Sequence, residues 1–215
     1  TNTIVAAGGC AQVVETSSIT ITTLPVGTFS YASSPFCSTA NDPSPAYSGG
    51  GVAGAFTSAN GLVFVNAGTG VVDISASTAG TYTVTNTIVA AGGCAQVVAT
   101  SSIVIQATAV ATFSYAGTPY CSTANDPSPS YGNTGGVAGA FTASGAQNAL
   151  SINAGTGAVD ISASTAGTYT VTNTIVAANG CAQVVATSSI IINTLPVATF
   201  SYAGTPYCSN DNDPS

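Results

Sequence analysis

The chain has 215 residues, of which 45% are apolar and only 3% charged, with no Lys, Arg or His and a formal net charge of −7. Without cations it cannot neutralise phosphates, which excludes binding to nucleic acid and to anionic membrane surfaces. The abundance of apolar and β-branched residues is typical of a folded all-β chain and argues against disorder.

Three stretches of the chain have nearly the same sequence: Thr1–Ile21, Thr85–Ile105 and Thr172–Ile192. Each successive pair agrees at 19 of 21 positions, and the offsets are 84 and then 87 residues. Such a period is long enough for one small domain, and repetition of this kind is typical of spacers, fibres and adhesin arrays. We expect the chain to be a window onto a longer array.

The repeat predicts four segments. Residues 1–22 are expected to be the C-terminal hairpin of a preceding repeat, 23–106 and 107–193 two complete repeats, and 194–215 the N-terminal part of a following repeat. A repeat of this size can bury a single modest core. The linkers between repeats are very short and carry no Gly/Ser tether, so the repeats are expected to stack as a semi-rigid, elongated rod.

The clearest strand of the first complete repeat is Gly80–Val89. Tyr82, Val84 and Ile88 point to one face, and four threonines point to the other. This period of two indicates a half-buried antiparallel strand with a threonine-coated outer face. An Ala-Ala-Gly-Gly turn follows, and residues 94–105 are expected to form the partner strand. The turn residue Gly92 is replaced by asparagine in the next repeat, which fits a position with positive φ.

The second complete repeat continues the pattern of short strands. We expect strands at Val110–Tyr115, Val137–Thr142, Ala149–Ile152 and Ala158–Ser162, the last two flanking a Gly-containing turn. Turn signals recur every 8–12 residues and no helical period is present, which predicts a β-sandwich of about seven strands. The tyrosine two residues into the late strand, Tyr169 here, also matches the placement found in immunoglobulin-like domains. The fold prediction is therefore all-β: tandem immunoglobulin-like β-sandwich repeats of about 84–87 residues.

Each repeat carries two cysteines, which indicates a disulfide framework and an oxidising, extracellular location. Within a repeat the expected pairs are Cys37–Cys94 and Cys121–Cys181, which leaves Cys10 and Cys208 for partners outside the window. Bridging across neighbouring repeats, for example Cys10–Cys37, is the alternative. Two thiols per repeat, with no His and no closely spaced Cys pair, cannot complete a zinc site.

The acidic residues suggest no strong metal or catalytic site. The Asn-Asp-Pro-Ser sequence at Asp42 recurs at Asp126, and each repeat offers too few carboxylates for a typical calcium site, so a turn stabilised by the Asp side chain is expected. Asp42 and Asp73 could form a glycosidase-like pair, but both are more simply turn or strand-edge residues. No His or Lys could activate a serine. We expect no enzyme activity, no cofactor and no metal.

A longer motif carries a family resemblance. Thr-Phe-Ser-Tyr, Pro-Tyr-Cys, Gly-Ala-Phe, Gly-Thr-Gly-Ala-Val-Asp-Ile-Ser-Ala-Ser-Thr-Ala-Gly-Thr-Tyr-Thr-Val and Asn-Gly-Cys follow one another through Thr112–Cys181, with an equivalent run at Thr28–Cys94. The unit resembles repeats of giant secreted surface proteins of Bacteroidetes, and it is similar to the gliding-motility adhesins of the SprB type that the type IX secretion system exports. The resemblance implies a cell-surface filament that is moved along the cell to grip a substratum.

These observations favour a structural or adhesive repeat segment of an extracellular filament. Its expected partners are neighbouring repeats, like filaments, and an external surface or glycan. The alternatives are a self-associating structural fibre or sheath, and a non-catalytic stalk of a larger secreted enzyme. Because no cation protects the sheet edges, lateral association that depends only weakly on ionic strength is also expected.

Overall fold

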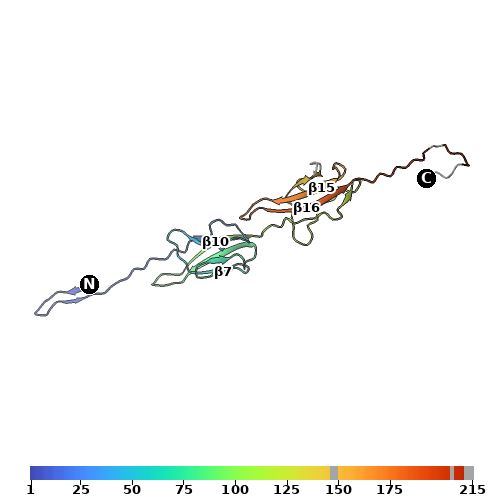
Figure 1. Ribbon diagram of the computed structural model, residues 1–215. Coiled ribbons are helices and arrows are strands. Elements are labelled where there is room, and N and C mark those ends of the chain that lie inside the picture. Colours follow the sequence, from blue (N-terminus) through green and yellow to red (C-terminus); the bar gives the residue numbers. More distant parts are fainter. Residues whose placement is uncertain (146–149, 204–205, 211–215) are drawn as a thin grey trace. The chain divides into compact units, whose positions relative to one another are not determined.

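The computed structural model describes residues 1–145, 150–203 and 206–210 (Figure 1). These residues form sixteen strands, β1 to β16, and include no helix. The prediction of an all-β fold is therefore confirmed. The described part of the chain accordingly contains no helix long and apolar enough to cross a membrane. The chain divides into two compact units, unit 1 (Thr1–Thr108 with Asn179–Cys181) and unit 2 (Ala109–Ala178 with Ala182–Ser215).

Unit 1 is organised around a sheet with the strand order β4-β10-β9-β6. Its strands are β4 (Phe36–Cys37), β6 (Ala55–Ser58), β9 (Gly80–Ile88) and β10 (Val97–Gln106). β9 and β10 form an antiparallel hairpin, and β6 lies antiparallel along the other side of β9. β4 pairs in parallel with the last residues of β10, and Cys37 lies opposite Gln106. This register places Cys37 at the C-terminal end of β10.

Three short strand pairs complete unit 1. β3 (Phe29–Ser30) pairs with β5 (Ala46–Tyr47), β7 (Val63–Asn66) pairs with β8 (Val71–Asp73), and β1 (Asn2–Ile4) forms a separate hairpin with β2 (Val13–Glu15). The core lies between the main sheet and the pairs β3–β5 and β7–β8, because buried residues from both sides belong to one cluster. This arrangement is a β-sandwich.

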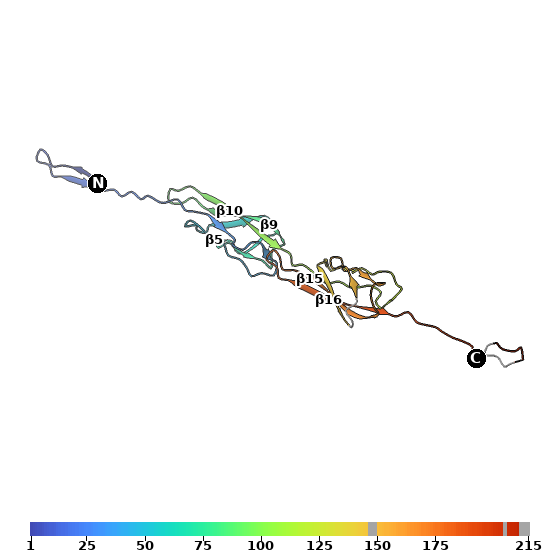
Figure 2. The same ribbon diagram turned by 90° about the horizontal axis from the view of Figure 1, so that it is seen from above.

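Unit 2 repeats the main sheet of unit 1. Its strand order is β11-β16-β15-β12, with β11 (Tyr120–Cys121), β12 (Ala140–Gly145), β15 (Gly167–Ile175) and β16 (Val184–Asn193). A further pair joins β13 (Ser151–Ile152) to β14 (Val159–Asp160). Figure 2 labels the central hairpins of the two units, β9 with β10 and β15 with β16. The parallel pairing recurs as well, and it places Cys121 opposite Asn193 at the end of β16.

The hairpin predicted from Gly80 is confirmed, although its second strand begins at Val97 and not at residue 94. β9 and β10 together span residues 80–106, and in the turn that joins them Gly92 has a φ of 60°, while its counterpart Asn179 has a φ of 51°. Tyr82 lies at the start of β9, and its hydroxyl donates a hydrogen bond to the Thr78 carbonyl at 2.9 Å. Tyr169 makes the same bond in unit 2. A tyrosine that bonds back to the chain just upstream is the tyrosine corner of immunoglobulin-like sandwiches.

Two strand predictions in the second repeat need correction. Val110–Tyr115 is not a strand, because its backbone bonds go to separate partners: Val110 O accepts from Val137 N, while Ser114 exchanges bonds with Ser130. Without a common partner no ladder can form. The predicted strand Val137–Thr142 begins later, at Ala140. The predictions at 149–152 and 158–162 correspond to β13 and β14, with residue 149 outside the described residues.

Aromatic side chains fill the core of each unit. The Phe29 and Phe56 rings meet edge to face with centroids 5.2 Å apart, and Phe113 and Phe141 do the same in unit 2 at 5.3 Å. Such edge-to-face pairs place the positive edge of one ring against the negative face of the other. A buried hydrogen bond adds to this packing, because the Tyr31 hydroxyl donates to the Gly70 carbonyl at 2.6 Å.

A buried asparagine joins three segments in each unit. Asn86 on β9 is fully buried; its Nδ2 donates to the Gly27 and Val52 carbonyls, and its Oδ1 accepts from Gly54 N. Asn173 makes the equivalent three bonds in unit 2. A buried amide is tolerated only when its polar atoms are bonded, so this residue ties the entry segment and the loop before β6 to the central strand.

Candidate functional site

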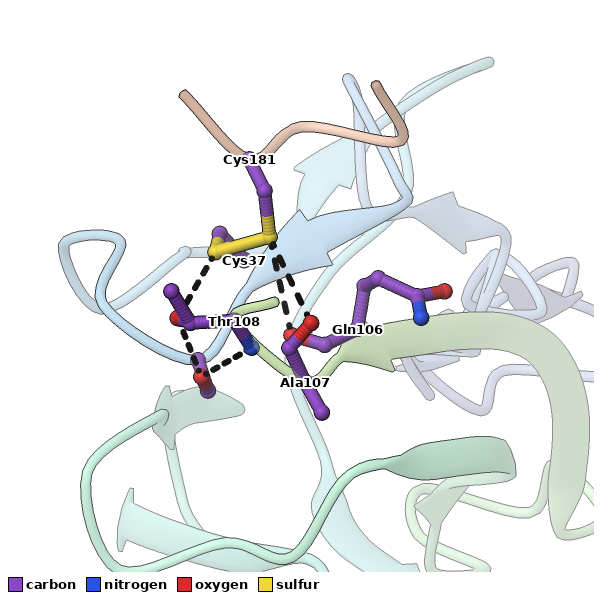
Figure 3. The surroundings of a disulfide bond; sticks show 6 residues. Cys37, Gln106, Ala107, Thr108 and Cys181 are labelled. Carbon is purple, nitrogen blue, oxygen red and sulfur yellow. Dashed lines mark hydrogen bonds between the residues drawn. A yellow bond between two sulfur atoms is a disulfide. The ribbon is translucent and has the colours of Figure 1, made fainter. Parts of the chain in front are cut away.

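The structure holds a disulfide between Cys37 and Cys181, which are separated by 144 positions in the sequence (Figure 3). The two Cα atoms lie 4.7 Å apart, within the usual range for a disulfide. Cys37 lies on β4, and Cys181 lies at the tip of the hairpin between β15 and β16. The bond therefore joins residues expected in two successive sequence repeats, 23–106 and 107–193, while both cysteines belong to unit 1. It is the feature of the chain with the clearest chemistry.

The predicted pairs Cys37–Cys94 and Cys121–Cys181 are wrong. Cys37 lies beside Gln106 at the C-terminal end of β10, whereas Cys94 precedes the first residue of that strand. A strand of this length spans about 30 Å, while bridged Cα atoms must lie within about 7 Å. Cys121 and Cys181 stand at opposite ends of β16 for the same reason. Bridging across repeats, the alternative at the sequence level, is present, with Cys181 and not Cys10 as the partner of Cys37.

The disulfide and the residues that surround it are called the junction. Hydrogen bonds hold its Cys37 side in place. A disulfide sulfur carries no proton, so the Thr108 hydroxyl is the donor in its 3.3 Å contact with Cys37 Sγ. The Ser38 hydroxyl then donates to Thr108 Oγ1 at 3.0 Å and accepts from Thr108 N. Ser38 N also donates to the Gln106 carbonyl at 2.8 Å. These bonds fix the residue after β4 against the end of β10, and with it the position of Cys37.

Close backbone packing holds the Cys181 side. A Cβ added at Gly180 would lie 2.3 Å from the Pro35 carbonyl oxygen and 3.3 Å from Cys37 N, so that only glycine fits there. Gly180 also has a φ of 79°, which L side chains rarely adopt. Cys181 Sγ lies 3.8 Å from the Gln106 and Ala107 carbonyl oxygens. The hairpin tip is thus seated on the segment that contains Pro35 and Cys37.

The Asn-Asp-Pro-Ser sequences hold the fold together through distant contacts. Asp42 accepts a hydrogen bond from Ile74 N at 2.9 Å, and Asp126 accepts from Ile161 N at 2.8 Å. The expected turn within the loop is therefore replaced by a bond to a strand end more than thirty residues away. Each carboxylate therefore holds a distant segment of backbone in place, which is a structural role.

The other acidic residues of the repeats stabilise local turns. Ala76 N and then the Ser75 hydroxyl donate hydrogen bonds to the Asp73 carboxylate and lower its pKa. The Ser162 hydroxyl, followed by Ala163 N, lowers the pKa of Asp160 in the same way. Among the described residues, no group of three or more His, Cys, Asp or Glu side chains is placed to hold a metal ion.

Sequence reasoning missed two functional features. The first is the pairing partner of Cys37, which depends on the non-local register of β4 against β10. The second is the buried asparagine, for which a signal existed: a polar residue stands on the apolar face of the same strand at Asn2, Asn86 and Asn173. A polar residue on a buried face in every repeat indicates a bonded structural role.

Comparisons with known proteins assign no family to the chain. No family model matches it, and no curated protein matches it. Solved structures with some likeness include a SusE-like surface-located polysaccharide-binding protein from the Bacteroides thetaiotaomicron heparin utilisation locus, at 16% identity with a TM-score of 0.29, covering 79% of this chain and 34% of that one.

Two cadherins show a similar, distant likeness. Drosophila N-cadherin EC1-4 matches at 10% identity with a TM-score of 0.37, covering 79% of this chain and 48% of that one. Mouse cadherin-23 EC22-24 matches at 12% identity with a TM-score of 0.31, covering 82% and 65%. The chain thus spans between about a third and two thirds of the three structures, and none of these likenesses bears on its function.

Proposed function

We propose that this chain is a structural and adhesive repeat segment of an extracellular filament. The observation that carries the proposal is the Cys37–Cys181 disulfide, which joins successive repeats by a covalent bond. Disulfides persist in oxidising compartments, which supports an extracellular location. The repetition of one sandwich supports a role in reach and mechanical continuity, in which no single repeat needs a reactive site.

The disulfide supports a role under tension. The stretch of 144 positions from Cys37 to Cys181 contains β6, β9 and β10 of unit 1 and β11, β12 and β15 of unit 2, whereas β16 lies outside it. If the chain is pulled from its ends, force passes through the disulfide and the strands inside the loop are not extended. Without the bond, the same residues would lengthen by about 500 Å on full extension. A filament that grips a surface benefits from a length that stays constant under load.

The surface chemistry favours neutral contacts for adhesion. Thr81 and Thr83 on β9, with Thr168 and Thr170 on β15, are exposed on the outer face of the central hairpins. Hydroxyl groups donate and accept hydrogen bonds without charge. We therefore assign adhesion to hydroxyl and amide groups that face a glycan or another neutral surface, with a weak dependence on salt because few charges exist to be screened.

The specific role proposed is that of a gliding-motility adhesin, and its support is the sequence resemblance to repeats of that class. Antibodies raised against this chain and applied to intact producing cells test the role. The proposal expects labelled filaments on the outer surface that move along the cell and that release attached cells when they are sheared off. Label confined to the cell interior would overturn it.

Force spectroscopy tests the mechanical part. The chain is held at its two ends and stretched until the units unfold, first oxidised and then after reduction with dithiothreitol. The proposal expects the fully stretched length to grow by about 500 Å on reduction, because 144 additional positions become extensible. A stretched length that reduction leaves unchanged would overturn it. The Cys10→Ser variant is the matched control and should behave as the parent chain does.

A further inference from the structure

Two hairpin tips with the same sequence plan have different surroundings. The tip of the β15–β16 hairpin carries Gly180 and Cys181, and the tip of the β9–β10 hairpin carries their counterparts Gly93 and Cys94. Pro35 lies against Gly180, since its carbonyl oxygen would be 2.3 Å from an added Cβ. At Gly93, which has the same left-handed conformation, an added Cβ would meet no described atom within 4 Å. One tip is occupied and the other is open.

Half of the junction is nevertheless present at the open tip. Cys94 Sγ donates to the Thr22 carbonyl at 3.5 Å, and Thr22 is the repeat counterpart of Gln106, whose carbonyl lies beside Cys181 Sγ. A Cβ added at Gly92 would also contact the Thr22 side chain at 3.3 Å. The residue equivalent to Gln106 is therefore in place beside Cys94, whereas no described atom lies near Gly93 as Pro35 lies near Gly180.

The open tip borders a cavity of suitable character. A hollow of about 300 Å³ lies beside Cys94, and most of its lining is apolar, with Pro25, Ile88 and Val89 among the residues that form it. A Pro-aromatic-Cys segment has an apolar body and a thiol at its end. An apolar segment that ends in a thiol would therefore suit the apolar hollow, the open side of Gly93 and the half-buried Cys94 thiol.

We propose that Cys94, together with Gly93 and the Thr22 carbonyl, is a covalent docking site for the Pro-Phe-Cys or Pro-Tyr-Cys segment of another repeat of this sequence. The structure supplies the precedent, because Pro35–Cys37 occupies the equivalent place at Cys181. Two thiols join with the loss of two protons and two electrons, and an external protein disulfide accepts the electrons and becomes a dithiol. This inference stands on geometry and does not depend on an adhesive role.

Cys121 supplies the complementary half. It lies on β11 opposite Asn193, as Cys37 lies on β4 opposite Gln106, so its thiol is presented from the same place in the sandwich. The Thr123 hydroxyl donates to Cys121 Sγ at 3.4 Å, and bonds from Thr123 and then Ser122 lower the pKa of this thiol. A larger thiolate fraction favours exchange with a disulfide.

The consequence is a chain of overlapping covalent loops. Cys94 bonds to a preceding repeat, and Cys121 bonds to a following one. Both residues lie inside the loop that the Cys37–Cys181 disulfide closes. Because residue 121 lies inside the 37–181 loop, the next loop begins before the first one ends. In such an array every repeat is bypassed by a disulfide.

A peptide with the chain's own sequence tests the site. The probe is Ala116–Ser122, Ala-Gly-Thr-Pro-Tyr-Cys-Ser, with its thiol activated as a 2-thiopyridyl disulfide. It is added to the full chain with the Cys37–Cys181 bond intact. The Cys94 thiolate attacks the peptide sulfur, a new disulfide forms, and 2-thiopyridone leaves with the electron pair. Mass spectrometry then measures the rate at each cysteine.

Cys10 is the matched control within the same molecule. It lies in an identical Ala-Ala-Gly-Gly-Cys tip and is exposed, but Gly8, the counterpart of Gly92, has no described atom within 4 Å of an added Cβ. Docking predicts that the peptide labels Cys94 at least about tenfold faster than Cys10, and that a scrambled peptide loses the preference. Equal or faster labelling of the more exposed Cys10 would overturn the proposal, as would equal preference with the scrambled peptide.

Discussion

Cys37 and Cys181 are 144 positions apart in the sequence, yet their Cα atoms lie 4.7 Å apart and a disulfide joins them. The contact arises from two ordinary features. A parallel pairing brings β4 to the end of β10, and a glycine turn lets the hairpin tip approach the Pro35 carbonyl closely. The junction between repeats is therefore built from backbone register and a small residue.

The double variant Cys37→Ser, Cys181→Ser should lower the free energy of unfolding. Closure of a loop of this length removes entropy from the unfolded chain, worth about 5 kcal/mol on the chain-entropy estimate and typically 2–5 kcal/mol in practice. Urea titration followed by circular dichroism measures the change. Cys10→Ser is the control and should leave the midpoint where it was. A double variant as stable as the parent would show that the bond does not constrain the unfolded chain.

Asn86→Ala should be strongly destabilising. The substitution removes three hydrogen bonds and leaves Gly54 N and two carbonyls without their partner in a fully buried site, at about 1–3 kcal/mol for each unsatisfied group. Thr83→Ala on the exposed face of the same strand is the matched control, with an expected change within about 0.5 kcal/mol. Similar losses for the two variants in a denaturant titration would contradict the role given to the asparagine.

Gly157→Ala should cost more than Gly155→Ala. Gly157 has a φ of 73°, and an added Cβ would lie 2.9 Å from the Phe141 ring, so backbone strain and overpacking together should cost about 2–4 kcal/mol. At Gly155 the closest group is the Asn153 side-chain oxygen at an ordinary 3.6 Å. Thermal unfolding of the two variants measures the difference. Equal melting temperatures would show that the ring moves aside without cost.

Stability should fall between about pH 10 and pH 12. Burial raises the pKa of Tyr115 to about 12, with smaller contributions from Tyr131 and Tyr120, and burial raises that of Tyr31 as well. The folded chain then holds protons that the unfolded chain has released, so the contribution is complete below pH 10 and is lost as the pH rises through the folded value. Urea midpoints at pH 9 and 11.5 measure the loss. Tyr115→Phe should flatten the pH dependence, and an unchanged slope in that variant would contradict the assignment.

Self-association, if sheet edges drive it, should respond weakly to salt. The chain has seven acidic residues and no side-chain cation, so raising the ionic strength removes little attraction or repulsion. Sedimentation velocity at about 0.01 M and about 1 M salt compares the two limits of screening. Association that is strong only at low salt, or a chain that stays monomeric at high concentration, would contradict the expectation.

Local patterns in the sequence predicted much of the fold because the relevant information is local. The alternation in Gly80–Val89, the glycine turn and the position of Tyr82 all lie within one hairpin, and the structure confirms each of them. Val110–Tyr115 has the same apolar character but divides its backbone bonds between two distant partners. Apolar alternation alone therefore could not show that this segment lacks a ladder.

The cysteine pairing could not be predicted in the same way. Two cysteines in one repeat suggest each other as partners, but the decisive fact is the end of the strand at which each one stands. That depends on the parallel register of β4 against β10, which pairs residues about seventy positions apart in the sequence. The buried asparagine is the opposite case. Comparison of the repeats alone shows a polar residue at the same position on the apolar face of the strand, which indicates its role.

The most direct test of the account is the disulfide map of the oxidised chain. Trypsin has no site here because Lys and Arg are absent, so chymotrypsin is used without reduction and the linked fragments are identified by mass spectrometry. The account predicts a fragment pair that contains Cys37 and Cys181 and that separates on reduction. Fragment pairs that join Cys37 to Cys94 and Cys121 to Cys181 would contradict it.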